Sequence, residues 1–198
     1  MTCSKNVIEN FIDGQYQAPI NNRYLDNIEP ATGLVYGKIP NSDNADVEKA
    51  VATAERALPA WRALDLEQRA DFLIAIAKEI ESQLEPLAIA EATDNGKPVA
   101  LAKMVDIPRA ASNFKFFAHA CSQFASESHA MANSAINYTL RQPVGIVGCI
   151  SPWNLPLYLF TWKIAPALAA GNCVIAKPSE ITPKTAAMLG IICQKVGL

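Results

Sequence analysis

Two short, purely apolar runs in the C-terminal part of the chain constrain its fold more than any other feature. The first covers residues 145–150 (GIVGCI) and the second residues 173–176 (CVIA). Strands without alternating polar residues are typical of parallel sheets that are covered on both faces. An apolar helix is predicted between the two runs over residues 157–170, and another helix follows the second run and ends near Val196. This order of strand, helix, strand and helix predicts a βαβα unit with parallel strands.

The almost uncharged stretch 143–176 could be mistaken for a membrane span. Pro152, Pro156, Pro166 and Lys163 interrupt it, so no unbroken apolar run of about 18 residues remains. With 51% hydrophobic and 18% charged residues, the chain has enough apolar area for a folded core. We therefore expect a folded α/β protein without a membrane partner. The net charge of −2 gives no reason to expect nucleic acid as a partner either.

The cysteines predict a reducing, cytoplasmic environment. They are scattered and form no Cys-x-x-Cys pair; their positions are Cys3, Cys121, Cys149, Cys173 and Cys193. With only two histidines, the chain shows no spacing typical of a metal site, and no metal is expected. The first residues lack the apolar segment of a signal peptide. Cys149 and Cys173 lie in predicted buried strands, where thiols are usually inert, so neither is predicted to be a nucleophile.

The part of the chain before residue 142 predicts short strands and amphipathic helices. Turn signals bound the strands, and apolar spacing of three and four residues marks the helices. The predicted strands lie at residues 10–16 (a hairpin), 24–28, 34–39 and 136–141, and the predicted helices at residues 44–62, 66–84, 86–93 and 107–124. Residues 125–135 are small and polar and are predicted to form a linker.

Individual residues predict how these helices begin, end and pack. Val47 falls on the apolar face of the first helix. Asp65 with Gln68 predicts a capping box at the start of the second, and Asp106 is the predicted N-cap of the fourth. Asn95-Gly96 is the predicted end of the third.

Two loops are expected to share one edge of the parallel sheet, because the carboxyl ends of parallel strands meet there and ligands bind at that edge. These loops are residues 151–156 and 177–180. Lys177 and Glu180 can share a vicinal diol such as a ribose, since the ammonium donates to a hydroxyl oxygen and the carboxylate accepts from hydroxyl hydrogens. The carboxylate would repel a 2′-phosphate, which favours NAD over NADP. The alternative is a surface ion pair worth less than about 1 kcal/mol.

Asn154 in the first loop is a candidate donor to a developing oxyanion, because prolines on both sides restrict the loop that carries it. The alternative is a turn residue that bonds to its own backbone. No Gly-x-Gly-x-x-Gly motif is present, so the usual dinucleotide fingerprint gives no support here.

Several motifs together resemble the aldehyde dehydrogenase superfamily over nearly the whole chain. They are Ser151-Pro152-Trp153-Asn154-Leu155-Pro156, residues 166–172 (PALAAGN), residues 177–183 (KPSEITP), residues 28–33 (IEPATG) and residues 95–98 (NGKP). The resemblance implies a Rossmann-like parallel sheet with flanking helices and a β-hairpin of an oligomerisation domain. It divides the chain into residues 1–127 and 144–198, both belonging to an NAD-binding domain, and residues 128–143, the hairpin and linker.

The resemblance also implies roles for individual residues. Asn154 matches the asparagine that helps to form the oxyanion hole. Lys177 and Glu180 match the pair that holds the adenosine ribose of NAD, and Ser179 belongs to the same cofactor-binding loop. The residues implied to line the cofactor site are Ile150, Ser151, Pro152 and Trp153.

Within the superfamily, residues 106–109 (DIPR), 113–117 (NFKFF) and 153–158 (WNLPLY) resemble the muconic-type semialdehyde dehydrogenases. Arg109 would then bind a carboxylate of the substrate, as guanidinium groups do. The alternative for Arg109 is a structural ion pair on its own helix face. The implied protein is a cytoplasmic homo-oligomer that oxidises a semialdehyde with NAD.

In that superfamily the nucleophilic cysteine, the general-base glutamate and a second Gly-rich motif all lie further along than Leu198. We therefore expect the 198 residues alone not to turn over an aldehyde, since a catalytic domain is absent from them. The alternative is a non-catalytic module that binds nucleotide or associates with other subunits. A third interpretation is an unrelated α/β nucleotide-binding protein.

Overall fold

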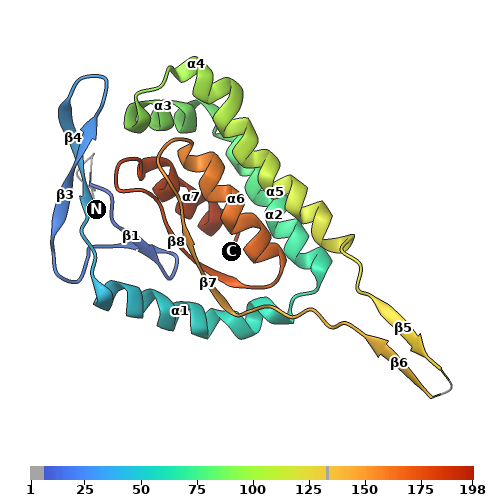
Figure 1. The fold of residues 1–198 in the computed structure, drawn as a ribbon. Coiled ribbons are helices and arrows are strands. Elements are labelled where there is room, and N and C mark those ends of the chain that lie inside the picture. The colour runs from blue at the N-terminus through green and yellow to red at the C-terminus, as the bar shows by residue number, and fades with distance from the viewer. Residues whose placement is uncertain (1–6, 133) are drawn as a thin grey trace.

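The computed structural model describes residues 7–132 and 134–198, so Cys3 lies outside the described residues. Figure 1 shows helices gathered around a short parallel strand pair, with one hairpin projecting from the body. In chain order, two antiparallel hairpins come first, then a group of helices, the projecting hairpin, and a βαβα segment. The mixed α/β class predicted from the sequence is confirmed.

Both N-terminal hairpins form as predicted. Strands β1 (Asn10–Ile12) and β2 (Gln15–Gln17) pair antiparallel, and β3 (Tyr24–Glu29) pairs antiparallel with β4 (Leu34–Pro40). The first turn needs positive φ angles at Asp13 (57°) and Gly14 (70°), which Asp and Gly tolerate better than most residues.

The predicted helices of the first half are present as α1 (Asn44–Ala63), α2 (Leu66–Ser82) and α3 (Leu84–Asn95). The capping box of α2 is confirmed, since the Gln68 amide donates to the Asp65 carboxylate at 2.8 Å and the Gln68 side chain accepts from the Asp65 amide at 3.0 Å. Gly96 ends α3 in the left-handed conformation, also as predicted.

The structure differs from the predictions for the helices at two residues, Val47 in α1 and Asp106 before the fourth predicted helix. Val47 is 53% exposed, so the buried face of α1 is narrower than its apolar spacing indicated. Asp106 does not cap a helix. The chain is already helical before it, through α4 (Val99–Leu101) and the π-helical turn η1 (Ala102–Asp106), and continues into α5 (Ile107–Ser122). The carboxylate of Asp106 instead accepts from the nearly buried ammonium of Lys97 at 2.6 Å, because that ammonium needs a counter-ion.

The predicted βαβα segment is confirmed. Strands β7 (Ile146–Ile150) and β8 (Cys173–Lys177) pair in parallel, with Ile146 opposite Cys173 and Ile150 opposite Lys177. Helix α6 (Pro156–Ala169) connects them and α7 (Lys184–Lys195) follows. Helices α1 and α6 both contact the strand pair (Figure 1). The prediction that both faces of this strand are covered is wrong for Ile150, which is 70% exposed because it lies at the carboxyl end of β7.

The hydrophobic core lies between the helices. Its fully buried side chains include Leu73, Ile80, Phe114 and Leu157, from α2, α5 and α6. Burying each such side chain contributes about 1.5–3 kcal/mol. Trp61 of α1 joins this core and donates its indole N–H to the carbonyl of Leu168 at 3.2 Å, which anchors α1 against α6.

The projecting hairpin consists of β5 (Ser128–Met131) and β6 (Ala135–Tyr138), and all its described residues are exposed (Figure 1). The linker predicted over residues 125–135 is therefore wrong for residues 128–131 and 135, and the strand predicted over residues 136–141 ends at Tyr138. Residues 128–131 carry no strand pattern of their own and become a strand by pairing with β6. No helix of the described part of the chain is long and apolar enough to cross a membrane.

Candidate functional site

The two loops predicted to share one sheet edge are in direct contact. The backbone N–H of Ser151, directly after β7, donates to the carbonyl of Lys177 at the end of β8, with 3.1 Å between the atoms. Ser151 is buried and its hydroxyl reaches the Leu159 carbonyl of α6 at 3.4 Å. The structure thus brings the loops together, as parallel strand ends require.

Lys177 and Glu180 lie side by side at this edge. The Lys177 Nζ and Glu180 Oε2 atoms are 3.0 Å apart, and the two side chains are 61% and 59% exposed. The backbone N–H of Glu180 and then Lys177 lower the pKa of the Glu180 carboxyl below its usual value. The lowered pKa favours the charged form of Glu180, and both side chains are open to a ligand, a geometry that suits both a diol site and a surface ion pair.

Ser179, between these two residues, shapes the loop from inside. Its side chain is buried, and its hydroxyl accepts from the backbone N–H of Ile181 at 3.3 Å. Its carbonyl also accepts from the N–H of Thr182 at 3.3 Å. Ser179 thus holds the turn that presents Glu180, and its hydroxyl is not aimed at solvent.

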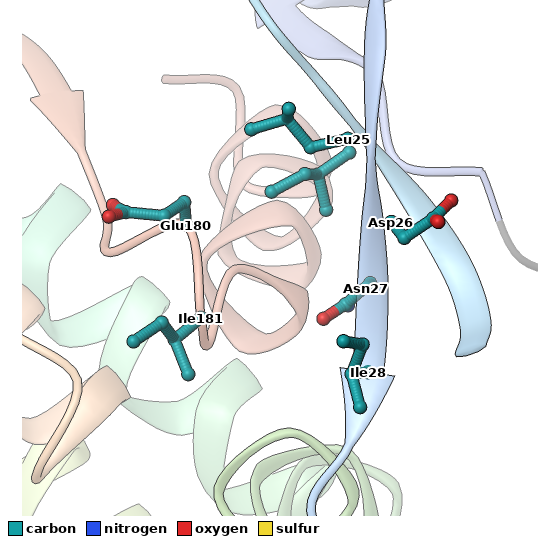
Figure 2. Close-up of a pocket in the computed structure, with 7 residues that line it drawn as sticks. Leu25, Asp26, Asn27, Ile28, Glu180 and Ile181 are labelled. Atoms are coloured by element: carbon teal, nitrogen blue, oxygen red, sulfur yellow. The ribbon is translucent and has the colours of Figure 1, made fainter. Parts of the chain in front are cut away.

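A cavity of about 190 Å³ lies on the other side of the Glu180 loop. Its lining is mostly apolar and comes from strands β3 and β4 and from the loop: Leu25, Asp26, Asn27, Ile28, Ile39, Glu180 and Ile181. Figure 2 shows the carboxylate of Glu180 directed away from β3 and the side chain of Asp26 pointing to the opposite side of its strand. The cavity therefore meets the aliphatic part of Glu180 and not the charged end that would bind a diol.

The loop that carries Asn154 is held at several points. The Asn95 side chain donates to the Trp153 carbonyl at 2.8 Å, and Pro156 begins helix α6 directly afterwards. Asn154 itself is exposed. A fixed backbone with an exposed carboxamide is what an oxyanion donor requires. Of the neighbouring residues predicted to line a cofactor site, three are exposed, namely Ile150, Pro152 and Trp153, whereas Ser151 is buried.

Arg109 lies beside an aromatic row between α5 and α6. Its guanidinium carbon is 5.3 Å from the ring centre of Tyr158, whose ring in turn contacts that of Trp162 at 5.6 Å. Within residues 7–132 and 134–198 Arg109 forms no ion pair, so the alternative of a structural ion pair on its helix is not found. Its exposed guanidinium can receive a carboxylate next to an aromatic surface.

Two acidic residues that bond to the helices after these loops, Glu91 to α6 and α7 and Asp94 to α7 alone, were not recognised from the sequence. Glu91, fully buried in α3, accepts from the Leu157 amide at 3.3 Å and from the Thr185 hydroxyl at 2.8 Å. Asp94, one turn later, accepts from the Lys184 amide at 2.7 Å. These donors belong to the first turns of α6 and α7, where a negative charge is favourable. The signal available in the sequence was two acids three residues apart, one within and one directly after the apolar helix predicted over residues 86–93.

Burial changes the protonation of both acids. Desolvation raises the pKa of Glu91 to about 7, against the lowering effects of the Thr185 hydroxyl, Lys97 and the Leu157 amide. Desolvation likewise raises the pKa of Asp94 to about 6, although the Lys184 amide and the Asn27 side chain favour the charged form. Both carboxyl groups thus titrate nearer to neutral pH than exposed acids do.

The thiols of the strands do not provide a nucleophile. Burial raises the pKa of Cys149 and of Cys173, which keeps them protonated and unreactive. No group of three or more metal-ligating side chains occurs in the described part of the chain.

The "Aldehyde dehydrogenase family" model matches residues 16–198, which is most of the chain. The chain belongs to the aldehyde dehydrogenase family. The resemblance predicted from the loop motifs is thereby confirmed.

Among curated aldehyde dehydrogenases, the chain is 48% identical over 193 residues to the 2-aminomuconic semialdehyde dehydrogenase of Homo sapiens, covering 97% of this chain and 39% of that protein. It is 42% identical to the 2-hydroxymuconic semialdehyde dehydrogenase of Pseudomonas sp. (strain CF600), covering 96% of this chain and 40% of that protein. The chain thus spans about two fifths of the length of these relatives.

Solved structures of relatives have the same fold. PnpE in complex with nicotinamide adenine dinucleotide matches with a TM-score of 0.92 and 36% identity, covering 98% of this chain and 39% of that one. The NAD+ complex of the Bacillus cereus aldehyde dehydrogenase matches with a TM-score of 0.94 and 31% identity, covering 98% and 40%. The arrangement of β7, α6, β8 and α7 is thus that of an aldehyde dehydrogenase.

Proposed function

We propose that this chain supplies the NAD site and the oxyanion donor for the oxidation of an aldehyde to a carboxylic acid. The observation that carries the proposal is the joined loop pair, in which one hydrogen bond from Ser151 to Lys177 places the Asn154 loop beside the Lys177–Glu180 pair. Family membership supplies the reaction class. NAD, when bound, would accept the hydride from the substrate carbon.

The donor and acceptor set at Lys177 and Glu180 fits a ribose. The Lys177 ammonium would donate to one hydroxyl oxygen, and the Glu180 carboxylate would accept from the hydroxyl hydrogens. Ile150, Pro152 and Trp153 expose apolar surface on the neighbouring loop, against which the rest of the cofactor would lie. Ser151 and Ser179 are buried, so we propose that they shape the two loops. The NAD complexes of two structural relatives support this choice of cofactor.

Asn154 would act on the carbonyl oxygen of the aldehyde. Its Nδ2–H donates to that oxygen as negative charge develops during attack on the carbonyl carbon. Loss of one such donor costs about 100- to 1,000-fold in turnover. The restrained backbone on both sides of Asn154 means that little reorganisation is needed when the charge forms.

The substrate that fits best is an acidic semialdehyde. Arg109 offers an exposed guanidinium without an acidic partner in the described part of the chain, next to the ring of Tyr158. A substrate carboxylate would supply that partner through paired hydrogen bonds. The likeness to muconic-type semialdehyde dehydrogenases supports the same class of substrate.

We also propose that the 198 residues do not turn over an aldehyde by themselves. Burial raises the pKa of the strand thiols Cys149 and Cys173, and raises that of Cys193 to about 12, which disfavours the thiolate at all three. None of these three thiols is activated for attack, so we propose a nucleophile from outside these residues. The described cysteines are all free, namely Cys121, Cys149, Cys173 and Cys193. Free thiols support a reducing, cytoplasmic location.

A second candidate function is subunit association, and the projecting hairpin favours it. Its apolar side chains are more than half exposed: Met131, Ile136 and Tyr138. Exposed apolar groups of this kind are typical of surfaces that another subunit covers. We therefore propose that residues 128–143 form an oligomerisation segment, and that residues 1–127 and 144–198 form the nucleotide-binding part.

Calorimetric titration of the 198-residue chain with NAD tests the proposed function. Saturable binding with a stoichiometry of about one per chain supports it. Heats of dilution alone, from a chain whose folding is confirmed by circular dichroism, contradict it.

A further inference from the structure

One buried carboxylate is bonded to the helices that follow both functional loops. Glu91 in α3 accepts from the amide of Leu157, three residues after Asn154, with distances of 3.3 and 3.4 Å to its two oxygens. It also accepts from the hydroxyl of Thr185 in α7, five residues after Glu180, at 2.8 Å. These two contacts connect segments that lie 66 and 94 residues from Glu91 in the sequence.

The surroundings of Glu91 fix its orientation. The side chain has no exposed surface, and Thr185 is 1% exposed, so water does not compete for these hydrogen bonds. The ammonium of Lys97 lies 3.9 Å from Glu91 Oε1 and 2.6 Å from Asp106. A buried carboxylate with donors on both oxygens is costly to move, because any displacement leaves a donor or an acceptor without a partner.

We propose that Glu91 is a positioning residue that holds the Asn154 loop and the Lys177–Glu180 loop in one fixed arrangement through the first turns of α6 and α7. This inference rests on the proposed NAD-dependent function, since it assigns Glu91 to the same site. Glu91 touches neither substrate nor cofactor. It acts through Leu157 and Thr185, and its loss loosens both loops together.

Three variants test the contacts of Glu91 with α6 and with α7 separately. Glu91→Ala removes both contacts, Glu91→Gln keeps one carbonyl oxygen as an acceptor, and Thr185→Val removes only the contact to α7. Glu85→Ala is the matched control, because Glu85 lies on the same helix and pairs with Lys103 at the surface. Each protein is examined by amide hydrogen exchange without ligand and by calorimetric titration with NAD.

We expect faster exchange in particular segments only, whereas general destabilisation would accelerate exchange over the whole chain. Glu91→Ala accelerates exchange of the Leu157 amide and of residues 178–187 but not of residues 24–40, and weakens NAD binding about tenfold. Glu91→Gln shows a smaller change of the same kind. Thr185→Val accelerates exchange in residues 178–187 alone and weakens NAD binding about fivefold. Glu85→Ala matches the parent protein.

Two results would overturn the inference. One is faster exchange spread evenly over the chain in Glu91→Gln and Thr185→Val. The other is unchanged NAD affinity in both. If Glu91→Ala does not fold, these two variants decide the question. If the parent chain itself binds no NAD, the proposed function fails, while the exchange pattern still shows whether Glu91 joins the two loops.

Discussion

The backbone N–H of Ser151 donates to the carbonyl oxygen of Lys177 across 3.1 Å, so the loops after two parallel strands are joined at the sheet edge. Between the end of β7 and the start of β8 lie 22 residues, which include helix α6. A ligand that contacts Asn154 and Glu180 at once therefore meets two loops that the strand pair holds side by side. This arrangement suits a dinucleotide, which is long enough to contact several loops.

The N-terminal hairpin packs tightly against α7 at Gly190. A Cβ atom at Gly190 would lie 2.8 Å from the ring of Phe11, closer than carbon atoms pack. Gly190→Ala should therefore lower the free energy of unfolding by about 1–3 kcal/mol, which thermal or urea unfolding would measure. Gly148→Ala is the control, since nothing lies within 4 Å of a Cβ there. Equal stability of the two variants would show that the ring of Phe11 does not pack closely against Gly190.

Stability should fall as the pH rises through the range in which Glu91 ionises. The folded protein keeps the Glu91 proton up to a pKa of about 7, whereas the unfolded chain releases it near 4.5. Between these values the folded state binds more protons, so the free energy of unfolding decreases with rising pH and levels off above about pH 7. Asp94, raised to about 6, acts in the same direction.

Glu91→Gln, which cannot titrate, tests this directly. Between pH 5 and pH 8, the free energy of unfolding of the parent should decrease by on the order of 2 kcal/mol more than that of the variant. Urea unfolding at each pH gives the difference, and groups common to both proteins cancel in the comparison. Parallel pH dependences of parent and variant would rule out the raised pKa of Glu91.

Local signals in the sequence predicted much of the fold, and contacts between distant segments explain the rest. The Asp65–Gln68 capping box and the left-handed Gly96 depend on neighbouring residues, so the sequence pattern suffices. Asp106 could be placed at a helix start but not paired with Lys97, because the chain before it is already helical through a π-helical turn that no periodicity predicts.

The candidate site was predictable to a similar extent. The order of strands and helices placed Lys177 and Glu180 at the same edge as Asn154, since parallel strand ends must meet. Glu91 was missed because its donors come from helices 66 and 94 residues away. A carboxylate among apolar residues shows only that some partner exists, and the fold decides which one.

Arg109 should govern affinity for acidic substrates. In an active enzyme that contains these residues, Arg109→Ala should raise KM for an acidic semialdehyde about 10- to 100-fold and change kcat little. An uncharged aldehyde of similar length is the control substrate, and its KM should stay within about twofold. Steady-state kinetics with both substrates gives the comparison. An unchanged KM for the acidic semialdehyde would show that Arg109 binds no substrate carboxylate.

The most direct test of the NAD site compares two exposed ion pairs of the same chain. Glu180 pairs with Lys177 at 3.0 Å, and Glu81 pairs with Lys115 at 2.5 Å, away from the loops. Each glutamate is replaced by glutamine, and each protein is titrated with NAD and NADP by calorimetry. The parent should prefer NAD, Glu180→Gln should weaken NAD binding about tenfold and reduce the preference over NADP, and Glu81→Gln should have no effect. A parent that prefers NADP, or identical NAD affinities for the two variants, would show that Glu180 does not bind the ribose of NAD.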